Sequence, residues 1–189
     1  MKKIILALST LLALPAVAMA HPGHDIANFA SGFSHPLTGI DHLLVMLAVG
    51  FWAGRSQSVG RWQMPMLFIV FMLFGVGLGS VMPVMAFTEV AIAVSLLALG
   101  LVILLSFSVN QLWQLCLTGV FALLHGLVHG QELVAQGSGM ASVLGLLSAT
   151  SILLGFGLFL ASFKNQIGPF LNRGMGSLLT LSGAYLLFL

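Results

Sequence analysis

The sequence predicts an all-α integral membrane protein, a bundle of six transmembrane helices that follows a cleaved signal peptide. Hydrophobic residues make up 59% of the 189-residue chain and charged residues only 5%, whereas soluble domains carry about 25% charged residues. The mean hydropathy is +1.13. The apolar residues also gather in repeated runs of roughly the ~20 residues that cross a ~30 Å hydrocarbon layer. These observations indicate a membrane protein rather than a globular one with a large core.

The first 20 residues have the pattern of a secretory signal peptide. Lys2 and Lys3 precede an apolar run over residues 4–14, and Pro15 and the small-residue pattern "AMA" follow it. This run is short for a ~20-residue span, which favours cleavage over an uncleaved anchor. The mature chain is then residues 21–189, a single transmembrane domain with four basic and four acidic residues. The absence of a basic patch argues against nucleic acid as a partner.

Six hydrophobic runs in the mature chain are long enough to approach or exceed a membrane span. We expect the spans at about 36–54, 64–85, 88–106, 110–130, 139–162 and 168–189. The connections between them are short and leave no room for a soluble domain. The chain also lacks a Walker-type glycine loop, so it does not hydrolyse ATP in the P-loop manner.

The positive residues predict one orientation in a bacterial inner membrane. If the signal peptide is cleaved outside the cytoplasm, the mature amino terminus is periplasmic and the connections after the first, third and fifth spans face the cytoplasm. The positive residues of the mature chain lie in or beside these connections: Arg55, Arg61, Lys164 and Arg173. The tryptophans at the same ends of the spans are Trp52, Trp62 and Trp113. Both features agree with the positive-inside tendency and an interfacial aromatic belt.

In this orientation the acids and imidazoles of the spans gather near the outer membrane face. They are His35, Asp41, His42, Glu89, His125, His129 and Glu132. An ionised side chain at the bilayer centre costs about 2.5 to 3.5 kcal/mol on insertion scales, so such residues usually pair, face a cavity or mark an ion path. Imidazole and carboxylate together suit nickel, cobalt, zinc or copper better than calcium or magnesium. We therefore expect a divalent transition-metal site.

The spacing of these residues places several of them on common helix faces. His125 and His129 are four residues apart, and Glu132 is seven from His125, so the three share one face of a helix. Asp41 directly precedes His42 and points about 100° away from it on a helix. Asp41 is therefore either a ligand itself or the carboxylate that orients a ligating imidazole.

Some of these residues also have plainer interpretations. His35 could cap the first span, with Pro36 at the favoured first helical position. Glu89 could be a helix-terminal acid that the helix dipole favours. The mature terminus "HPGHD" places His21 and His24 where they form either a metal-capture arm or a simple terminal linker.

Two motifs resemble those of a known family. The segment "HPLTGIDH", residues 35–42, is similar to the HPxxGxDH signature of the HupE/UreJ family of small membrane permeases, and "HGLVHGQE", residues 125–132, looks like the second histidine motif of that family. The region from Glu89 to Ser95 also fits the family's third helix. The positions that we expect to be structural within the two motifs are Pro36, Gly39, Gly126 and Gly130.

This resemblance implies secondary uptake of Ni²⁺ or Co²⁺ from periplasm to cytoplasm, without an ATPase, an enzymatic activity or a permanently bound cofactor. It implies a functional link to hydrogenase or urease maturation, and it assigns metal binding to His35, Asp41 and His42. It also supports the second motif as part of the site. The alternative is an intramembrane zinc-dependent hydrolase that uses the same histidines, although Gly126 stands where the HExxH motif has its glutamate.

Overall fold

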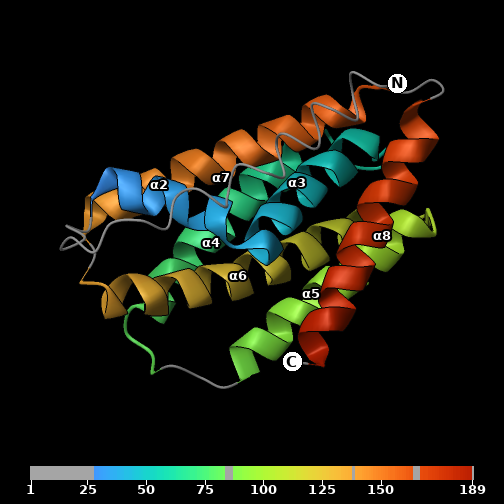
Figure 1. The fold of residues 1–189 in the computed structure, drawn as a ribbon. Coiled ribbons are helices and arrows are strands. Elements are labelled where there is room, and N and C mark those ends of the chain that lie inside the picture. The colour runs from blue at the N-terminus through green and yellow to red at the C-terminus, as the bar shows by residue number, and fades with distance from the viewer. Residues whose placement is uncertain (1–27, 84–86, 138, 164–166, 189) are drawn as a thin grey trace, which may run out of the picture.

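The computed structural model describes residues 28–83, 87–137, 139–163 and 167–188, which form seven helices (Figure 1). They are α2 (Phe29–Thr38), α3 (Ile40–Arg55), α4 (Gln63–Gly79), α5 (Phe87–Leu104), α6 (Gln111–Ala135), α7 (Met140–Ala161) and α8 (Ile167–Leu187). The expected signal peptide, His21, His24 and Lys164 lie outside the described residues.

Several of these helices are long and apolar enough to cross a membrane. Within the described segments, α5, α6 and α7 meet this criterion, and the bent pair of α2 and α3 makes a fourth crossing if it is counted as one span. The α4 helix is equally apolar but has 17 residues. The chain is therefore an all-helical, multi-pass membrane protein, and the count of six spans stays a prediction.

The first expected span, 36–54, is not one continuous helix. It is two helices, α2 and α3, which meet at Gly39 with a bend of 84°. The α2 helix already begins at Phe29, because the side chain of Asn28 caps it. Pro36 lies inside α2, so the expected capping role of His35 is wrong.

A local hydrogen bond helps to explain why α2 stops where it does. The hydroxyl of Thr38 donates to the carbonyl of His35 at 2.8 Å, which satisfies an acceptor that lies in the last turn of the helix. Gly39 then adopts an extended conformation, with φ −85° and ψ 111°, and α3 starts in a new direction. The break therefore lies inside the first motif, between its first histidine and its acid.

Glycines set the pairing of the helices. A Cβ atom on Gly126 of α6 would lie 2.2 Å from the carbonyl oxygen of Met72 in α4, and one on Gly50 of α3 would lie 2.1 Å from that of Leu154 in α7. Gly176 of α8 meets the backbone of α5 in the same way. Small residues allow helices to approach closely in lipid, where hydrophobicity alone does not drive their association. The bundle thus consists largely of three tightly packed pairs.

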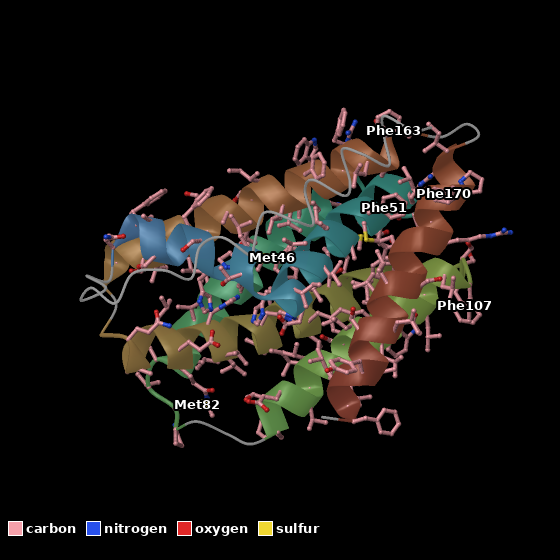
Figure 2. All side chains as sticks on the ribbon, viewed as in Figure 1. Met46, Phe51, Met82, Phe107, Phe163 and Phe170 are labelled. Atoms are coloured by element: carbon pink, nitrogen blue, oxygen red, sulfur yellow. The ribbon has the colours of Figure 1, made fainter. Side chains whose placement is uncertain are left out.

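The connections after α3, α5 and α7 meet at one end of the bundle. The Arg55 guanidinium donates to the carbonyl of Phe163 at 3.2 Å, and the Ser58 hydroxyl donates to that of Val109 at 3.3 Å. In Figure 2, Met82 lies at the opposite end of the molecule. These connections therefore share one end, as the distribution of positive residues predicts, and the membrane side to which this end belongs stays a prediction.

Candidate metal centre

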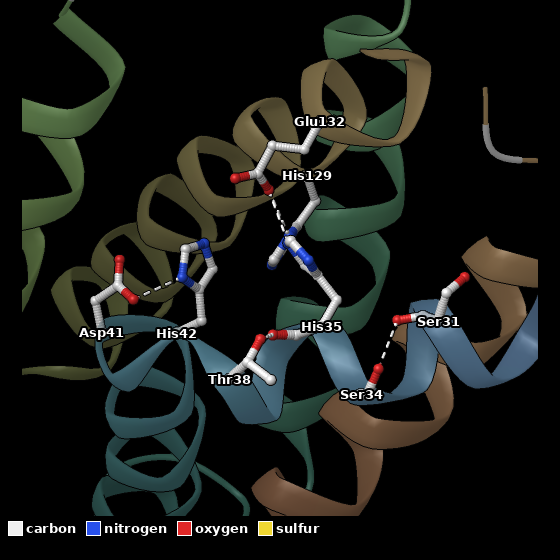
Figure 3. Close-up of polar contacts among 8 residues, drawn as sticks. All are labelled: Ser31, Ser34, His35, Thr38, Asp41, His42, His129 and Glu132. Atoms are coloured by element: carbon white, nitrogen blue, oxygen red, sulfur yellow. Dashed lines mark hydrogen bonds and ion pairs between the residues drawn. The ribbon is translucent and has the colours of Figure 1, made fainter. Parts of the chain in front are cut away.

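A cluster of imidazoles and carboxylates lies where the α2–α3 break meets α6 (Figure 3). Six of the seven ligands expected within the spans are brought together there: His35 from α2, Asp41 and His42 from α3, and His125, His129 and Glu132 from α6. The ring centroid of His42 lies 4.5 Å from that of His129 and 5.5 Å from that of His125. His35 is 5.1 Å from His129 by the same measure. We call these six residues the histidine cluster.

Two imidazoles of the cluster are oriented through their Nδ1 atoms. Nδ1 of His42 lies 2.8 Å from Oδ1 of Asp41, and Nδ1 of His125 lies 2.8 Å from the carbonyl oxygen of Phe121. A carbonyl or an ionised carboxylate only accepts, so Nδ1 carries the proton in both rings and Nε2 of a neutral ring keeps a free lone pair. Both Nε2 atoms are buried and have no hydrogen-bond partner in the part of the chain that the structure describes. This is the usual arrangement of a histidine that ligates a metal.

The outer part of the cluster combines two imidazoles with one carboxylate. Nε2 of His35 lies 2.8 Å from Oε2 of Glu132, and Nδ1 of His129 lies 3.5 Å from the same oxygen. One ligand atom from each of these three residues lies within 4.8 Å of the others. Both ring nitrogens of His129 are buried without a hydrogen-bond partner among the described residues. The three residues are thus close enough to share one ion.

The cluster extends from the middle of the bundle toward the end that lies opposite Arg55. Gly126, the neighbour of His125, packs against Met72, and Met72 in turn accepts a hydrogen bond from Thr150. Thr150 is ten residues into α7, or about 15 Å from its start at the usual rise per residue. His129 is completely buried, whereas the Glu132 side chain is 39% exposed. The cluster therefore connects a buried interior to a more accessible outer edge.

Fully buried apolar side chains close the inner side of the cluster. The Phe68 ring lies 6.4 Å from the His125 ring, centroid to centroid, and Phe68 has no exposed surface. Met46 follows His42 by one turn of α3 and is equally buried. An ion at the cluster would therefore meet a packed core on this side in the described conformation.

Glu89 is the expected ligand that the structure does not bring into the cluster. It is exposed in the first turn of α5. Within the described residues, the ion pairs of the acids join Asp41 and Glu132 to histidines and do not involve Glu89. Its contribution to metal binding stays a prediction.

Comparison with known proteins assigns the family. The model of the HupE / UreJ protein family matches residues 8–186. The chain belongs to this family. It is similar to Protein HupE of Rhizobium leguminosarum bv. viciae, with 37% identity over 177 residues that cover 93% of each chain. No solved structure matches.

In this HupE/UreJ chain, the motif glycines have visible packing roles. A Cβ atom on Gly39 would lie 2.9 Å from Nδ1 of His42 and 3.0 Å from Oδ1 of Asp41, so a side chain there would disturb this pair. Cβ atoms on Gly126 and Gly130 would lie within 2.3 Å of carbonyl oxygens of α4. The glycines of the second motif therefore hold α4 against the helix that carries its histidines.

The carbonyl of Phe121 is a part of the site that the sequence analysis missed. Phe121 precedes His125 by four residues, and its carbonyl accepts the Nδ1 proton of that ring. The signal is the helical spacing itself, since a histidine on a helix can donate to the carbonyl one turn earlier. Because the group that orients His125 is a main-chain carbonyl, which every residue has, no residue type in the sequence marks it.

Proposed function

We propose that this chain is a secondary permease that carries a divalent transition metal, nickel or cobalt, from the periplasm to the cytoplasm. The observation that carries this proposal is that buried, unpaired imidazole nitrogens of His42, His125 and His129 meet beside a broken helix. Secondary transporters typically bind their ions deep in the bundle, where a transmembrane helix is discontinuous. A cluster built only for stability would not leave these nitrogens without partners, because an unsatisfied buried polar group is costly.

The donor set also favours this class of ion. Nε2 of His42, His125 and His129 would be the buried ligands, and His35 with Glu132 would receive the ion at the outer edge. Neutral imidazoles bind nickel, cobalt, zinc and copper, and the nearby carboxylates would offset part of the ion's charge. The choice of nickel or cobalt rests on the family motifs, as does the proposed link to hydrogenase or urease maturation.

We also propose six crossings of the bacterial inner membrane, with the mature amino terminus in the periplasm after signal cleavage. Six alternating crossings require the first and fifth spans to run in the same direction. The Gly50–Leu154 and Gly54–Ala161 contacts between α3 and α7 have this parallel order. The end that carries Arg55 and Arg61 would then be cytoplasmic, by the positive-inside tendency. The membrane potential would favour inward movement by about 2.3 kcal/mol per charge per 100 mV.

The hydrolase alternative has weaker support from the same geometry. A zinc hydrolase needs a carboxylate that is free to act as a general base on a metal-bound water. Asp41 is engaged by His42, and Glu132 is engaged by His35. We therefore favour transport over catalysis.

Reconstitution into liposomes tests this proposal. We expect uptake of radioactive nickel or cobalt under an inside-negative potential, and we expect His42→Ala and His129→Ala to abolish it. Thr118→Val is the matched control, because Thr118 is fully buried in α6 and its hydroxyl, among the described residues, bonds only to the carbonyl of Gln114. Uptake that persists in both histidine variants would contradict the permease proposal, and metal-dependent cleavage of lipid or peptide would favour the hydrolase.

A further inference from the structure

A second polar region, unrelated to the histidine cluster, lies at the opposite end of the bundle. It is a cavity of about 810 Å³ between the last residues of α3 and α5 and the first residues of α6 and α8. Ligand pockets in proteins usually have volumes of about 300 to 1,000 Å³. Its polar lining includes Arg55, Ser58, Ser108, Gln114 and Asn172. No function assigned above uses this cavity.

Arg55 is the charged residue in the lining of this cavity, and its guanidinium has few hydrogen-bond partners among the described residues. A guanidinium has five N–H donors. One nitrogen, Nη2, donates to the carbonyl of Phe163 at 3.2 Å, and Cζ lies 5.3 Å from the centroid of the Phe51 ring. Nε is buried and has no hydrogen-bond partner within the described residues.

The described part of the chain provides no carboxylate to balance this charge. Asp41 and Glu132 belong to the histidine cluster. Glu89 lies in the first turn of α5, whereas the cavity is lined by residues at the other end of that helix. A partly buried cation without a counter-ion is unfavourable, so the site is suited to an anion from outside the described chain.

The backbone around Arg55 holds its guanidinium at the start of another helix. A Cβ atom on Gly168 would lie 2.6 Å from Nη2 of Arg55 and 2.8 Å from the carbonyl oxygen of Phe163, so a side chain there would force the guanidinium to move. Gly168 is the second residue of α8. The first turn of a helix attracts anions through its dipole and its N–H groups, of which Pro169 contributes none. The guanidinium and a helix amino terminus therefore converge on one side of the cavity.

Another part of the cavity lining is held in place by the side-chain amide of Gln114. Oε1 of Gln114 accepts from the hydroxyl of Ser56 at 2.6 Å, and Nε2 donates to the hydroxyl of Ser58 at 3.1 Å and to the carbonyl of Val109 at 2.7 Å. The Gln114 amide therefore stabilises the cavity wall, because both of its Nε2 protons are used within the protein. Arg55 is the lining residue that carries a positive charge, and its buried Nε has no hydrogen-bond partner within the described residues, which makes Arg55 the recognition group.

We propose that this cavity binds an oxyanion, such as a phosphate group, between the Arg55 guanidinium and the first turn of α8. The phosphate has two sources at such a place, a soluble ion or the headgroup of an anionic lipid. Trp62 and Trp113 are exposed at the same end of the bundle, as expected for residues at a membrane interface. The proposal does not rest on the metal-transport proposal.

Site-resolved protection of arginine tests this proposal on the full mature chain in nanodiscs. Phenylglyoxal modifies accessible guanidinium groups, and peptide mapping reports Arg55 and Arg61 separately in one sample. Arg61 is the internal control, because it is close in sequence but does not line the cavity. In phosphatidylcholine nanodiscs we expect inorganic phosphate to slow modification of Arg55 several-fold and to leave Arg61 unchanged. Protection by phosphatidylglycerol without added phosphate would identify a lipid headgroup as the source.

Two variants separate anion recognition from simple burial of Arg55. Gly168→Ala keeps the positive charge but displaces the guanidinium, and Arg55→Gln removes the charge. We expect both to lose the phosphate or phosphatidylglycerol that native mass spectrometry detects on the wild type. Equal rates at Arg55 with and without phosphate and with either lipid would overturn the proposal. If Gly168→Ala does not fold, the wild-type protection experiment alone decides the question.

Discussion

The histidine cluster and the hydrogen-bond network of Gln114 differ in how completely their polar groups are paired. Around Gln114, the amide oxygen and the amide nitrogen both have hydrogen-bond partners. In the histidine cluster, the Nε2 atoms of His42 and His125 have none among the described residues, although both are buried. Both sites therefore contain buried polar groups. They differ because the imidazole Nε2 atoms have no hydrogen-bond partner in the described segments, whereas the Gln114 amide does. The comparison indicates that Gln114 stabilises the fold, whereas the imidazoles await a ligand.

The largest expected effect is the loss of an imidazole ligand. His42→Ala or His129→Ala should weaken Ni²⁺ binding by more than the ~10- to 100-fold typical of changes to residues that only orient a ligand. The reason is that each variant removes a buried donor nitrogen rather than its support. Isothermal titration calorimetry of the detergent-solubilised protein measures the Ni²⁺ affinity. If Gln114→Ala reduced the affinity equally, the distinction between the two regions would be lost.

A smaller loss is expected when Asp41, which orients His42, is removed. Asp41→Ala should weaken Ni²⁺ binding about 10- to 100-fold, because the ring of His42 loses the carboxylate that fixes its orientation and its proton. Glu89→Ala is the comparison variant and should cause a smaller loss, since Glu89 is also an acid in the first turn of a helix but is exposed and outside the cluster. An equal loss of equilibrium affinity in both variants would mean that Glu89 joins the site in another conformation.

The grouping of the six residues in the histidine cluster was largely predictable from the sequence, because they lie in two short segments with helical spacing. The spacing of His125, His129 and Glu132 already placed them on one face, and the structure brings this face to His42. The role of Asp41 remained open between ligand and orienter, since spacing does not show which atoms meet. The 2.8 Å contact with His42 supports the second role.

The break in the first span could not be predicted in the same way. Residues 36–54 form an uninterrupted apolar run apart from the motif, and a glycine at position 39 is compatible with a continuous membrane helix. The bend is accompanied by packing of α2 against α7 through Gly32 and Gly145. These are tertiary contacts, and the periodicity of the apolar run does not reveal them.

The stabilising role of Gln114 predicts a change in stability without a change in binding. Gln114→Ala should lower the free energy of unfolding by about 1 to 3 kcal/mol, because it removes the hydrogen bonds that Gln114 makes with Ser56, Ser58 and Val109. Denaturant titration in detergent measures this change, and the Ni²⁺ affinity should stay at its wild-type value. Gln111→Ala is the control, since Gln111 is exposed at the start of the same helix. Equal stability of the two variants would contradict a structural role for the Gln114 network.

The smallest effect is expected at the contact that lies level with His125, between the Thr150 hydroxyl and the Met72 sulfur. These atoms are 3.7 Å apart and buried, and a thioether is a weak acceptor. Thr150→Val should therefore cost only about 0.5 kcal/mol of stability, at the low end of hydrogen-bond contributions. The Ni²⁺ affinity should change by less than about twofold, the ratio that corresponds to a free energy of this size. Ser151→Ala is the control, because the neighbouring Ser151 is exposed and bonds only within α7. A several-fold loss of affinity in Thr150→Val alone would place Thr150 and Met72 among the groups that bind the ion. A buried group with a hydrogen-bond partner would then take part in binding, contrary to the difference between the Gln114 network and the histidine cluster.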